Sequence, residues 1–403
     1  MNILYVSTLC SQKTLEYIYK TSIVKPRYPA QKFHSLIVKG IAKQAKDIKL
    51  STLTSLPVTP SLHNRKLWNL KEEKEEGVTY KYIPLVNVKF FKNIGVFFYT
   101  LLKVFFWGLF NRKKGVLICD FLNLTIASAS LISCKITGVK IIAIATDMPG
   151  LMVSNSEKKS RLIKAIYNSV NKIILYRFSG YIMLTKYMQK KINPQNHPYM
   201  IMEGLVDINM KKRVNDLKSK SKDRILIYAG GLHEKYGIKT LLDAFTKLEE
   251  KDLKLHLYGG GSMDEIIKEF EQQDSRISYF GMQPNELVVQ KQLEATLLIN
   301  PRPTSEEFTL YSFPSKNMEY MVSGTPMITT RLPGMPDEYL DYVKLFEDET
   351  VEGMYLSLKE VLSCSRGELH NLGIEAKSFV LKFKNNEEQG KRILNFIKSL
   401  GKY

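Results

Sequence analysis

The sequence has few cysteines and, in its first half, few acidic residues. The four cysteines, Cys10, Cys119, Cys134 and Cys364, are scattered, without a CxxC spacing or a paired histidine. Disulfide frameworks and structural metal sites require clustered ligands, so we expect neither, and we expect a reducing compartment. The first residues lack the basic segment and long apolar run of a signal peptide, which favours a cytoplasmic protein.

The shortage of acid gives the two halves of the chain charges of opposite sign. Residues 1–200 hold 31 Lys and Arg against 9 Asp and Glu, a net +22, whereas residues 201–403 hold 28 against 31, a net −3. Such a field attracts nucleic acid, anionic lipid or an acidic substrate. No RRM, KH, zinc-finger or helix-turn-helix pattern appears, so we expect no nucleic acid partner. An anionic membrane surface, with peripheral attachment at the inner face of the cell membrane, remains a possible partner.

Length and patterning predict an α/β protein with two domains. The chain has 403 residues, 44% of them apolar, and short apolar segments alternate with helical patterns as in parallel sheets. No strand end carries the GxGxxG fingerprint of a nicotinamide dehydrogenase. In the first half we predict strands over residues 3–7, 49–53, 78–83, 116–120, 139–145 and 181–184, helices over 31–45, 124–137 and 157–178, a loop over 8–28 and a charged turn over 71–77. In the second half we predict strands over residues 224–228, 254–258, 277–280, 295–300 and 327–329, and helices over 238–248, 263–272, 315–323, 351–363 and 373–400.

Residues 300–338 are the most informative stretch. A helix is predicted to begin at Ser315 and Lys316 and to end at Gly324, which suits the left-handed cap position. Ligands of open parallel sheets bind beyond the carboxyl ends of the strands, and the first turn of such a helix suits phosphate. Lys316 adds a cation, and Glu319, one turn further on, can accept hydrogen bonds from a ribose diol. The stretch therefore predicts a site for a phosphorylated, hydroxyl-rich ligand.

A second phosphate-binding segment follows the strand predicted over residues 224–228. Gly230 and Gly231 would allow backbone N–H groups to approach phosphate oxygens closely, and Lys235 would neutralise part of their charge. A glycine pair alone is a weak signal. The Lys-x-Gly sequence and the helix that follow make it a moderate one.

These residues resemble a known family. Glu319, the run Ser323-Gly324-Thr325-Pro326-Met327-Ile328 and Gly334 are similar to the donor-nucleotide loop of retaining, GT-B-fold glycosyltransferases of family 4 (glycosyl transferases group 1), and the Ser-Phe-Pro-Ser-Lys sequence is similar to a subset of that family. The resemblance implies two Rossmann-like, doubly wound domains facing a cleft. It implies sugar transfer from a UDP- or GDP-sugar to a saccharide or lipid-linked acceptor with retention, in bacterial surface polysaccharide synthesis, without a metal or resident cofactor.

The resemblance also implies domain limits and further contacts. The first domain would cover residues 1–207, the linker 208–223 and the nucleotide domain 224–378, and a helix over 379–403 would cross back to the first domain. We expect this helix to bury Phe379, Phe383, Ile393, Phe396 and Ile397. Glu319 would bind the ribose, and the backbone around Gly281 and Met282 would contact the nucleobase.

Three positions depart from the family pattern. Tyr311 stands where the family has its first Glu, so either Glu306 or Glu307 replaces that residue from the loop, or the protein holds the donor sugar differently. Gly231 stands where the family has Arg, and Arg302, also at a strand end, is the candidate replacement. The family often has His-Asp in a loop of the first domain, and here Thr146 stands in place of the His whereas Asp147 is kept. Asp147 is a candidate site residue, and its alternative role is to cap the loop or the next helix.

The predicted catalytic residues are Asp147, Lys235 and Lys316. The two lysines and the helix start at Ser315, with Arg302, would stabilise charge on the leaving diphosphate. The predicted donor site comprises Gly230, Gly231, Lys235, Gly281, Met282, Arg302, Glu307, Tyr311, Ser315, Lys316 and Glu319. Because of the three departures, a GT-B-like protein that binds nucleotide sugars without transferase activity remains the alternative.

Two further features carry expectations. Residues 94–110 form an apolar run with Lys103 in its middle, and we favour a helix buried against the sheet. An amphipathic helix lying on a bilayer and a membrane-spanning helix are the alternatives. His34 would project from the start of its helix. It could contact a substrate there, but we favour a solvent-exposed side chain without a function.

Overall fold

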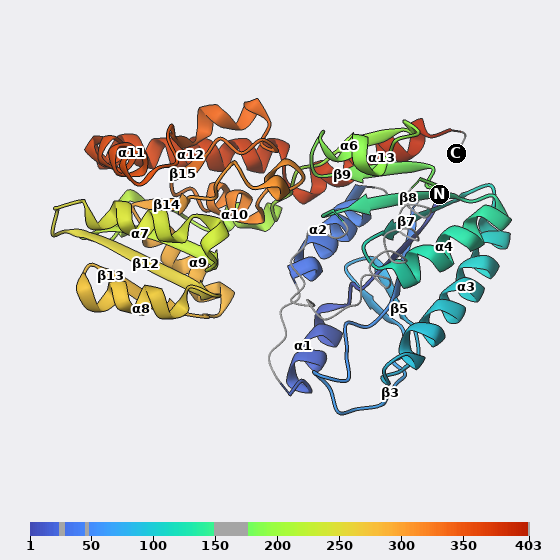
Figure 1. The fold of residues 1–403 in the computed structure, drawn as a ribbon. Helices are drawn as coiled ribbons and strands as arrows, with labels where there is room; N and C mark the ends of the chain where they lie inside the picture. Colours follow the sequence, from blue (N-terminus) through green and yellow to red (C-terminus); the bar gives the residue numbers. More distant parts are fainter. Residues whose placement is uncertain (24–28, 45–47, 149–175, 402–403) are drawn as a thin grey trace. The chain divides into compact units, whose positions relative to one another are not determined.

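The computed structural model describes residues 1–23, 29–44, 48–148 and 176–401. The chain divides into two compact units: unit 1 comprises residues 1–202 and 386–403, and unit 2 comprises residues 203–385. Figure 1 gives the element labels used from here on. The basic helix predicted over residues 157–178 falls mostly outside the described residues.

Unit 1 is built on an eight-stranded sheet of order β10-β9-β8-β7-β1-β2-β5-β4. All neighbouring strands are parallel except β4, which pairs antiparallel with β5. The strands are β1 (Asn2–Ser7), β2 (Lys49–Thr54), β4 (Glu73–Glu75), β5 (Val78–Tyr82), β7 (Gly115–Asp120), β8 (Lys140–Ala145), β9 (Gly180–Met183) and β10 (Tyr199–Ile201), with a separate pair of β3 (Leu67–Trp68) and β6 (Leu85–Val86). The helices are α1 (Gln12–Lys20), α2 (Pro29–Gln44), α3 (Phe91–Asn111), α4 (Leu124–Thr137), α6 (Met188–Ile192) and α13 (Asn386–Ser399).

Unit 2 is built on a fully parallel six-stranded sheet of order β13-β12-β11-β14-β15-β16. Its strands are β11 (Arg224–Gly231), β12 (Leu253–Gly260), β13 (Ile277–Gly281), β14 (Leu297–Asn300), β15 (Met327–Thr330) and β16 (Lys344–Phe346). Its α-helices are α7 (Ile238–Thr246), α8 (Asp264–Gln273), α9 (Asn285–Glu294), α10 (Ser315–Ser323), α11 (Val351–Ser363) and α12 (Arg366–Phe383). Its 3-10 helices are η1 (Ile208–Lys212), η2 (Leu217–Ser219), η3 (Glu234–Tyr236), η4 (Glu307–Leu310) and η5 (Asp337–Tyr342).

Both faces of the unit 2 sheet are covered by helices. Leu226 and Tyr228 of β11 join a buried cluster with α7, α8 and α11, whereas Ile227 between them joins a second cluster with α10 and α12. Successive residues of a strand point to opposite faces, so strands buried on both faces read as continuous apolar runs. This is why these strands could be predicted from the sequence.

Local signals account for several helix ends. Gly324 follows α10 with φ +79°, a left-handed conformation that favours glycine, as predicted. Ser365 and Glu368 form a reciprocal capping box at the start of α12. Helix α1 corrects the prediction of a loop over residues 8–28, because Ser11 caps this short helix by accepting a hydrogen bond from Thr14 N.

The end of the chain also differs from the prediction. The single helix predicted over residues 373–400 is two helices, α12 in unit 2 and α13 in unit 1, separated at Lys384 and Asn385. The helix stops because Val206 N donates to Lys384 O over 2.9 Å, while Asn385 forms a parallel bridge with Val206. Phe383, predicted to be buried, lies beside this break and is 47% exposed. The predicted linker, residues 208–223, lies within unit 2 and contains η1 and η2.

A buried ion-pair network lies beside this break in unit 2. Lys384 Nζ contacts Glu203 Oε1, and it lies 2.6 Å from Glu338 Oε1. Tyr339 donates its hydroxyl to Glu203 Oε1 over 2.6 Å. Glu203 and Lys384 are both buried, and Lys384 is the cation that compensates the charge of Glu203.

Helix α3 contradicts the favoured expectation for residues 94–110. Only 22% of its most apolar 18-residue window is buried in the protein, so it is not a buried core helix. By length and composition alone, it is also long and apolar enough to cross a membrane. One face packs on α4, which runs beside it in Figure 1, and large apolar side chains on other faces are exposed. The expectation failed because an apolar run does not indicate which of its faces a neighbour will cover.

Candidate functional site

The strand order of unit 2 identifies the edge at which a ligand would bind. The order reverses between β11 and β14, the first and fourth strands of the unit. In open α/β sheets, ligands occupy the crevice beyond the carboxyl ends of the strands at such a switch point. β11 ends at Gly230 and Gly231, and β14 is followed by Arg302, so residues predicted from two distant segments lie at this edge.

Lys316 reaches from the first turn of α10 to the end of β11. Its Nζ lies 3.6 Å from the centroid of the Tyr228 ring. A Cβ on Gly230 would lie only 2.6 Å from that Nζ, and Gly230 has φ +158°. Glycine at position 230 therefore leaves the space that the ammonium group occupies.

The charge of Lys316 is poorly compensated. Burial among protein atoms, followed by the nearby charge of Arg302, lowers the pKa of Lys316 well below its ordinary value, and Glu319 opposes this only in part. An anion bound here would restore the favourable environment of the ammonium group. A lysine in this condition is suited to a negatively charged ligand.

Two further cations, Lys235 and Arg302, lie against the rings of Tyr236 and Phe308. The guanidinium of Arg302 lies 4.7 Å from the ring centroid of Tyr236 and 5.2 Å from that of Phe308. Lys235 Nζ lies 5.3 and 5.4 Å from the same two centroids. Tyr236 also packs against Gly231, where an added Cβ would lie 3.1 Å from its Cε2. The structure thus brings Arg302 beside the position at which the family pattern has its arginine.

Hydrogen bonds fix the loop that carries Arg302. Thr330 Oγ1 donates to Arg302 O over 2.5 Å, and Thr304 N donates to both carboxylate oxygens of Glu349 over 3.1 and 2.9 Å. Asn300 Nδ2 donates to Asn317 Oδ1 over 2.7 Å, which ties the end of β14 to α10. The cations therefore stand on a constrained framework, as preorganised charge stabilisation requires.

The other predicted donor residues lie on the same elements or on neighbouring ones. Ser315 is exposed at the start of α10, and Glu319 is half-buried one turn further on. Glu307 is exposed at the start of η4, whereas Tyr311 is buried just after it. Glu307, rather than Tyr311, is therefore accessible to a ligand.

The residues predicted to contact the nucleobase are further away in the sheet. Gly281 ends β13, which is separated from β11 by β12, and Met282 follows it with an exposed side chain. Both lie at the same carboxyl edge of the sheet as the cations. Within the described residues, no three His, Cys, Asp or Glu side chains gather as a metal site.

In unit 1, Asp147 follows the carboxyl end of β8. Its Oδ1 accepts a hydrogen bond from Met148 N over 2.7 Å, which is the local loop contact considered as the alternative for this residue. The loop that continues from residue 149 lies outside the described residues. Asp147 therefore stays a predicted site residue of unit 1.

A buried polar cluster in unit 1 was not predicted. His34 Nδ1 and Tyr5 Oη form a hydrogen bond of 2.6 Å, and His34 Nε2 lies 3.5 Å from Asp120 Oδ2. His34 is fully buried, which corrects the expectation of a solvated side chain. Burial and the carboxylate of Asp120 raise the pKa of Tyr5 well above its ordinary value, so its hydroxyl keeps its proton. No sequence signal could have found this cluster, because its members come from β1, α2 and the end of β7.

Two Rossmann-like α/β units with these strand orders define the GT-B fold, and comparison with solved structures shows that fold over the whole chain. Sucrose-phosphate synthase from Thermosynechococcus elongatus matches with 12% identity and a TM-score of 0.67, covering 99% of both chains. The lipopolysaccharide outer core galactosyltransferase WaaB matches with 15% identity and a TM-score of 0.63, also covering 99% of both chains. HepE from Anabaena, solved with UDP, matches with 12% identity and a TM-score of 0.61, covering 99% of this chain and 100% of that one.

The sequence of unit 2 is similar to a known family. Residues 209–379 match the family model Glycosyl transferases group 1. The matched segment contains the glycine pair, the three cations and Glu319. No curated protein matches the chain significantly by sequence. Unit 2 is therefore similar in sequence to this family over residues 209–379, and the whole chain shares the GT-B fold.

Proposed function

We propose that this protein is a retaining family 4 glycosyltransferase that moves a sugar from a nucleoside-diphosphate sugar to a saccharide or lipid-linked acceptor. The observation that carries the proposal is the cluster of Lys235, Arg302 and Lys316 around the glycine pair at the switch point of unit 2. Retention is supported by the resemblance of the segment from Glu319 to Gly334 to the donor-nucleotide loop of that family. A role in bacterial surface polysaccharide synthesis is supported by that resemblance and by the likeness to WaaB.

The cluster suggests how the leaving diphosphate would be stabilised. The diphosphate would lie between the amino end of α10 and the Gly230–Gly231 turn, with Lys316 and Arg302 on its oxygens. Protein cations at these positions would take the part that a bound metal plays in other transferases. Glu319, one turn into α10, would accept hydrogen bonds from the ribose hydroxyls.

The transfer step then needs few further groups. The acceptor hydroxyl would attack the anomeric carbon on the face from which the diphosphate leaves, and a phosphate oxygen would take the hydroxyl proton. The bond between the anomeric carbon and the diphosphate oxygen breaks as the new glycosidic bond forms. Asp147 is proposed on the acceptor side.

We also propose that the protein acts in the cytoplasm. Cys10, Cys119 and Cys134 are buried free thiols, which supports the reducing environment of the cytoplasm.

A GT-B-like protein that binds nucleotide sugars without transfer is the second candidate. It is favoured by the buried Tyr311 and by Gly231, which stand where the family has a Glu and an Arg. The two candidates share the nucleotide site and differ only in turnover.

Calorimetric titration with UDP and GDP tests the nucleotide site. We expect one nucleotide to bind, and we expect Arg302→Met and Glu319→Ala each to weaken it about 10- to 100-fold, the range for a lost hydrogen bond to a charged group. Lys268→Met removes an exposed lysine of α8 as the matched control and should leave the affinity unchanged. Binding unaffected by both site variants would refute the placement of the nucleotide.

Diphosphate release from a panel of nucleotide sugars, with saccharide and lipid-linked acceptors, separates the two candidates. Release that depends on an acceptor supports the transferase, and the anomeric configuration of the product, read by nuclear magnetic resonance, tests retention. Nucleotide binding without release for every donor and acceptor supports the non-catalytic candidate.

A further inference from the structure

The buried face of helix α3 consists of small and β-branched side chains. Its buried residues are Val96, Thr100, Val104 and Gly108, which recur every four positions and so form one stripe. A Cβ added at Gly108 would lie 2.5 Å from Thr137 Oγ1 of α4, and Ser133 Oγ of α4 donates to Leu101 O over 2.7 Å. The two helices therefore approach closely, and most of the large side chains of α3 lie outside this contact.

Those bulky residues face outward. Seven large apolar side chains of α3 are each more than half exposed, namely Phe91, Ile94, Phe98, Leu102, Phe106, Leu109 and Phe110. Five of them, at positions 94, 98, 102, 106 and 109, recur every three or four residues and form a continuous stripe, and Ile132 and Ile136 on α4 are also exposed. A surface helix of a globular protein normally buries such a stripe, and exposed apolar patches of this kind mark interaction sites.

The charges around this face are almost all positive. Residues 88–140 contain eight Lys and Arg and a single acid, Asp120, which is buried at the end of β7. The exposed cations are Lys89, Lys103, Lys135 and the consecutive Arg112, Lys113 and Lys114 that follow the last turn of α3. An anionic surface complements this pattern, whereas a second copy of the same face would bring like charges together.

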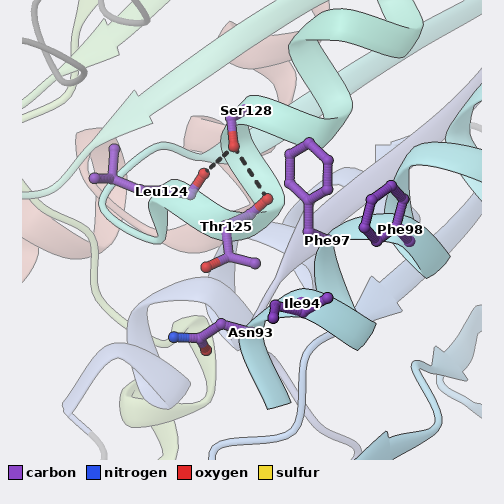
Figure 2. Close-up of a pocket in the computed structure, with 7 residues that line it drawn as sticks. All are labelled: Asn93, Ile94, Phe97, Phe98, Leu124, Thr125 and Ser128. Atoms are coloured by element: carbon purple, nitrogen blue, oxygen red, sulfur yellow. Dashed lines mark hydrogen bonds between the residues drawn. The ribbon is translucent and has the colours of Figure 1, made fainter. Parts of the chain in front are cut away.

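An apolar pocket opens on the same face. Figure 2 shows Ile94, Phe97 and Phe98 of α3 opposite Leu124, Thr125 and Ser128 of α4, and Asn93 also lines the pocket, whose volume is about 330 Å³. The hydroxyl of Ser128 is occupied by Leu124 O at 2.6 Å and Thr125 O at 3.3 Å. Four of the seven lining residues are apolar and the hydroxyl of Ser128 is already satisfied, so the pocket suits hydrocarbon better than a polar ligand.

We propose that the α3–α4 face of unit 1 docks on a lipid bilayer that carries anionic headgroups. The exposed stripe of α3 inserts among the acyl chains at the interface, and the pocket between α3 and α4 receives hydrocarbon. Lys103 extends its stem toward the headgroups, and Arg112, Lys113 and Lys114 contact the anionic lipids. The inference uses residues of unit 1 alone and does not depend on the nucleotide site of unit 2.

Vesicle co-sedimentation tests the apolar contribution. The full-length protein is mixed with vesicles of phosphatidylcholine containing 30% phosphatidylglycerol, and with pure phosphatidylcholine as the neutral reference. We expect binding to the anionic vesicles, reduced at least tenfold by the combined Phe98→Ser, Leu102→Ser and Phe106→Ser substitutions. Leu356→Ser is the matched control, because Leu356 of α11 is 54% exposed and Leu102 is 55% exposed.

A second set of variants tests the charges. Replacing Arg112, Lys113 and Lys114 by Gln should reduce partitioning about 100-fold, since each cation near an anionic surface contributes about a factor of five. Replacing the consecutive exposed cations of residues 211–213 in unit 2 by Gln removes the same charge elsewhere and should change little. Raising the salt concentration should weaken wild-type binding and should weaken that of the Arg112–Lys114 variant less.

Three outcomes overturn the proposal. The first is no binding of the wild type to anionic vesicles at low salt. The second is equal loss in the α3 variants and in their matched controls. The third is a dimer, seen by analytical ultracentrifugation, that the Phe98, Leu102 and Phe106 substitutions abolish without any effect on vesicles, since a second copy would then cover the face. Thermal unfolding of every variant confirms that each one folds.

Discussion

Replacing Lys316 by Met should stabilise the free protein while weakening its binding to UDP. Methionine keeps most of the apolar stem over the Tyr228 ring and removes a charge that burial and Arg302 disfavour. Each unit by which the pKa of a lysine is lowered in the folded state corresponds to about 1.36 kcal/mol of stability lost while the lysine is charged. The lost cation–π contact, about 0.5–2 kcal/mol, opposes this gain. We expect the removal of the disfavoured charge to outweigh the lost contact, so that the variant is more stable than the wild type.

The pH dependence gives this prediction a sign that can be checked. The folded-state pKa of Lys316 is lower than the ordinary value, so the unfolded chain binds more protons between these two pKa values. Wild-type stability therefore rises with pH through that window, up to about pH 10, and the Lys316→Met substitution removes this rise. The stability gap between the variant and the wild type should be largest at low pH and should close as the pH increases.

Ligand binding should show the opposite trend. A diphosphate favours the charged amine, so wild-type affinity for UDP falls as the pH rises toward about 10, whereas Arg302 keeps its charge throughout. Urea unfolding and calorimetry from about pH 6 to 10 measure both effects on wild type and Lys316→Met. A variant that is destabilised at every pH and binds UDP normally would refute the interpretation of Lys316 as a poorly compensated cation that binds a phosphate group.

Three further predictions concern stability. Lys384→Met should cost about 3–5 kcal/mol in urea unfolding, because it leaves the buried carboxylate of Glu203 unpaired, and a cost below about 1 kcal/mol would contradict the network. Gly108→Ala should destabilise through the close approach to α4, whereas Gly95→Ala on the same helix has open space and should stabilise by up to about 1 kcal/mol; equal effects would contradict the packing. Burial lowers the pKa of Lys220 to about 7, so wild-type stability should rise between about pH 7 and 10 relative to Lys220→Met, and parallel pH curves would argue against that burial.

Local sequence determined much of unit 2. The limits of α10, its left-handed Gly324 cap and the positions of Lys316 and Glu319 follow from helical spacing and glycine chemistry. Strands β11 to β15 of unit 2 follow from apolar runs bounded by glycine or proline, whereas the short edge strand β16 was not predicted. These signals are short-range, because neighbours within one turn or one strand determine them.

Tertiary structure alone decided the contacts between distant segments. Arg302 and Lys235 share the rings of Tyr236 and Phe308 only because β11 and β14 are adjacent in the sheet, although they are far apart in the sequence. The sequence suggested Arg302 as a replacement cation, but it could not position that residue. Strand order depends on the packing of whole helices against the sheet, which no local pattern encodes.

The sequence by itself established that α3 is apolar, that its surroundings are basic and that the chain alternates strands with helices. Only the tertiary structure decided which face of α3 is covered, that His34 is buried against Tyr5, and that the last helix breaks at Lys384. The composition and periodicity of a segment show how much apolar surface it can bury, and so how much burial can stabilise it. The neighbour that provides the burial, whether a helix such as α4 or a strand, is determined by long-range packing.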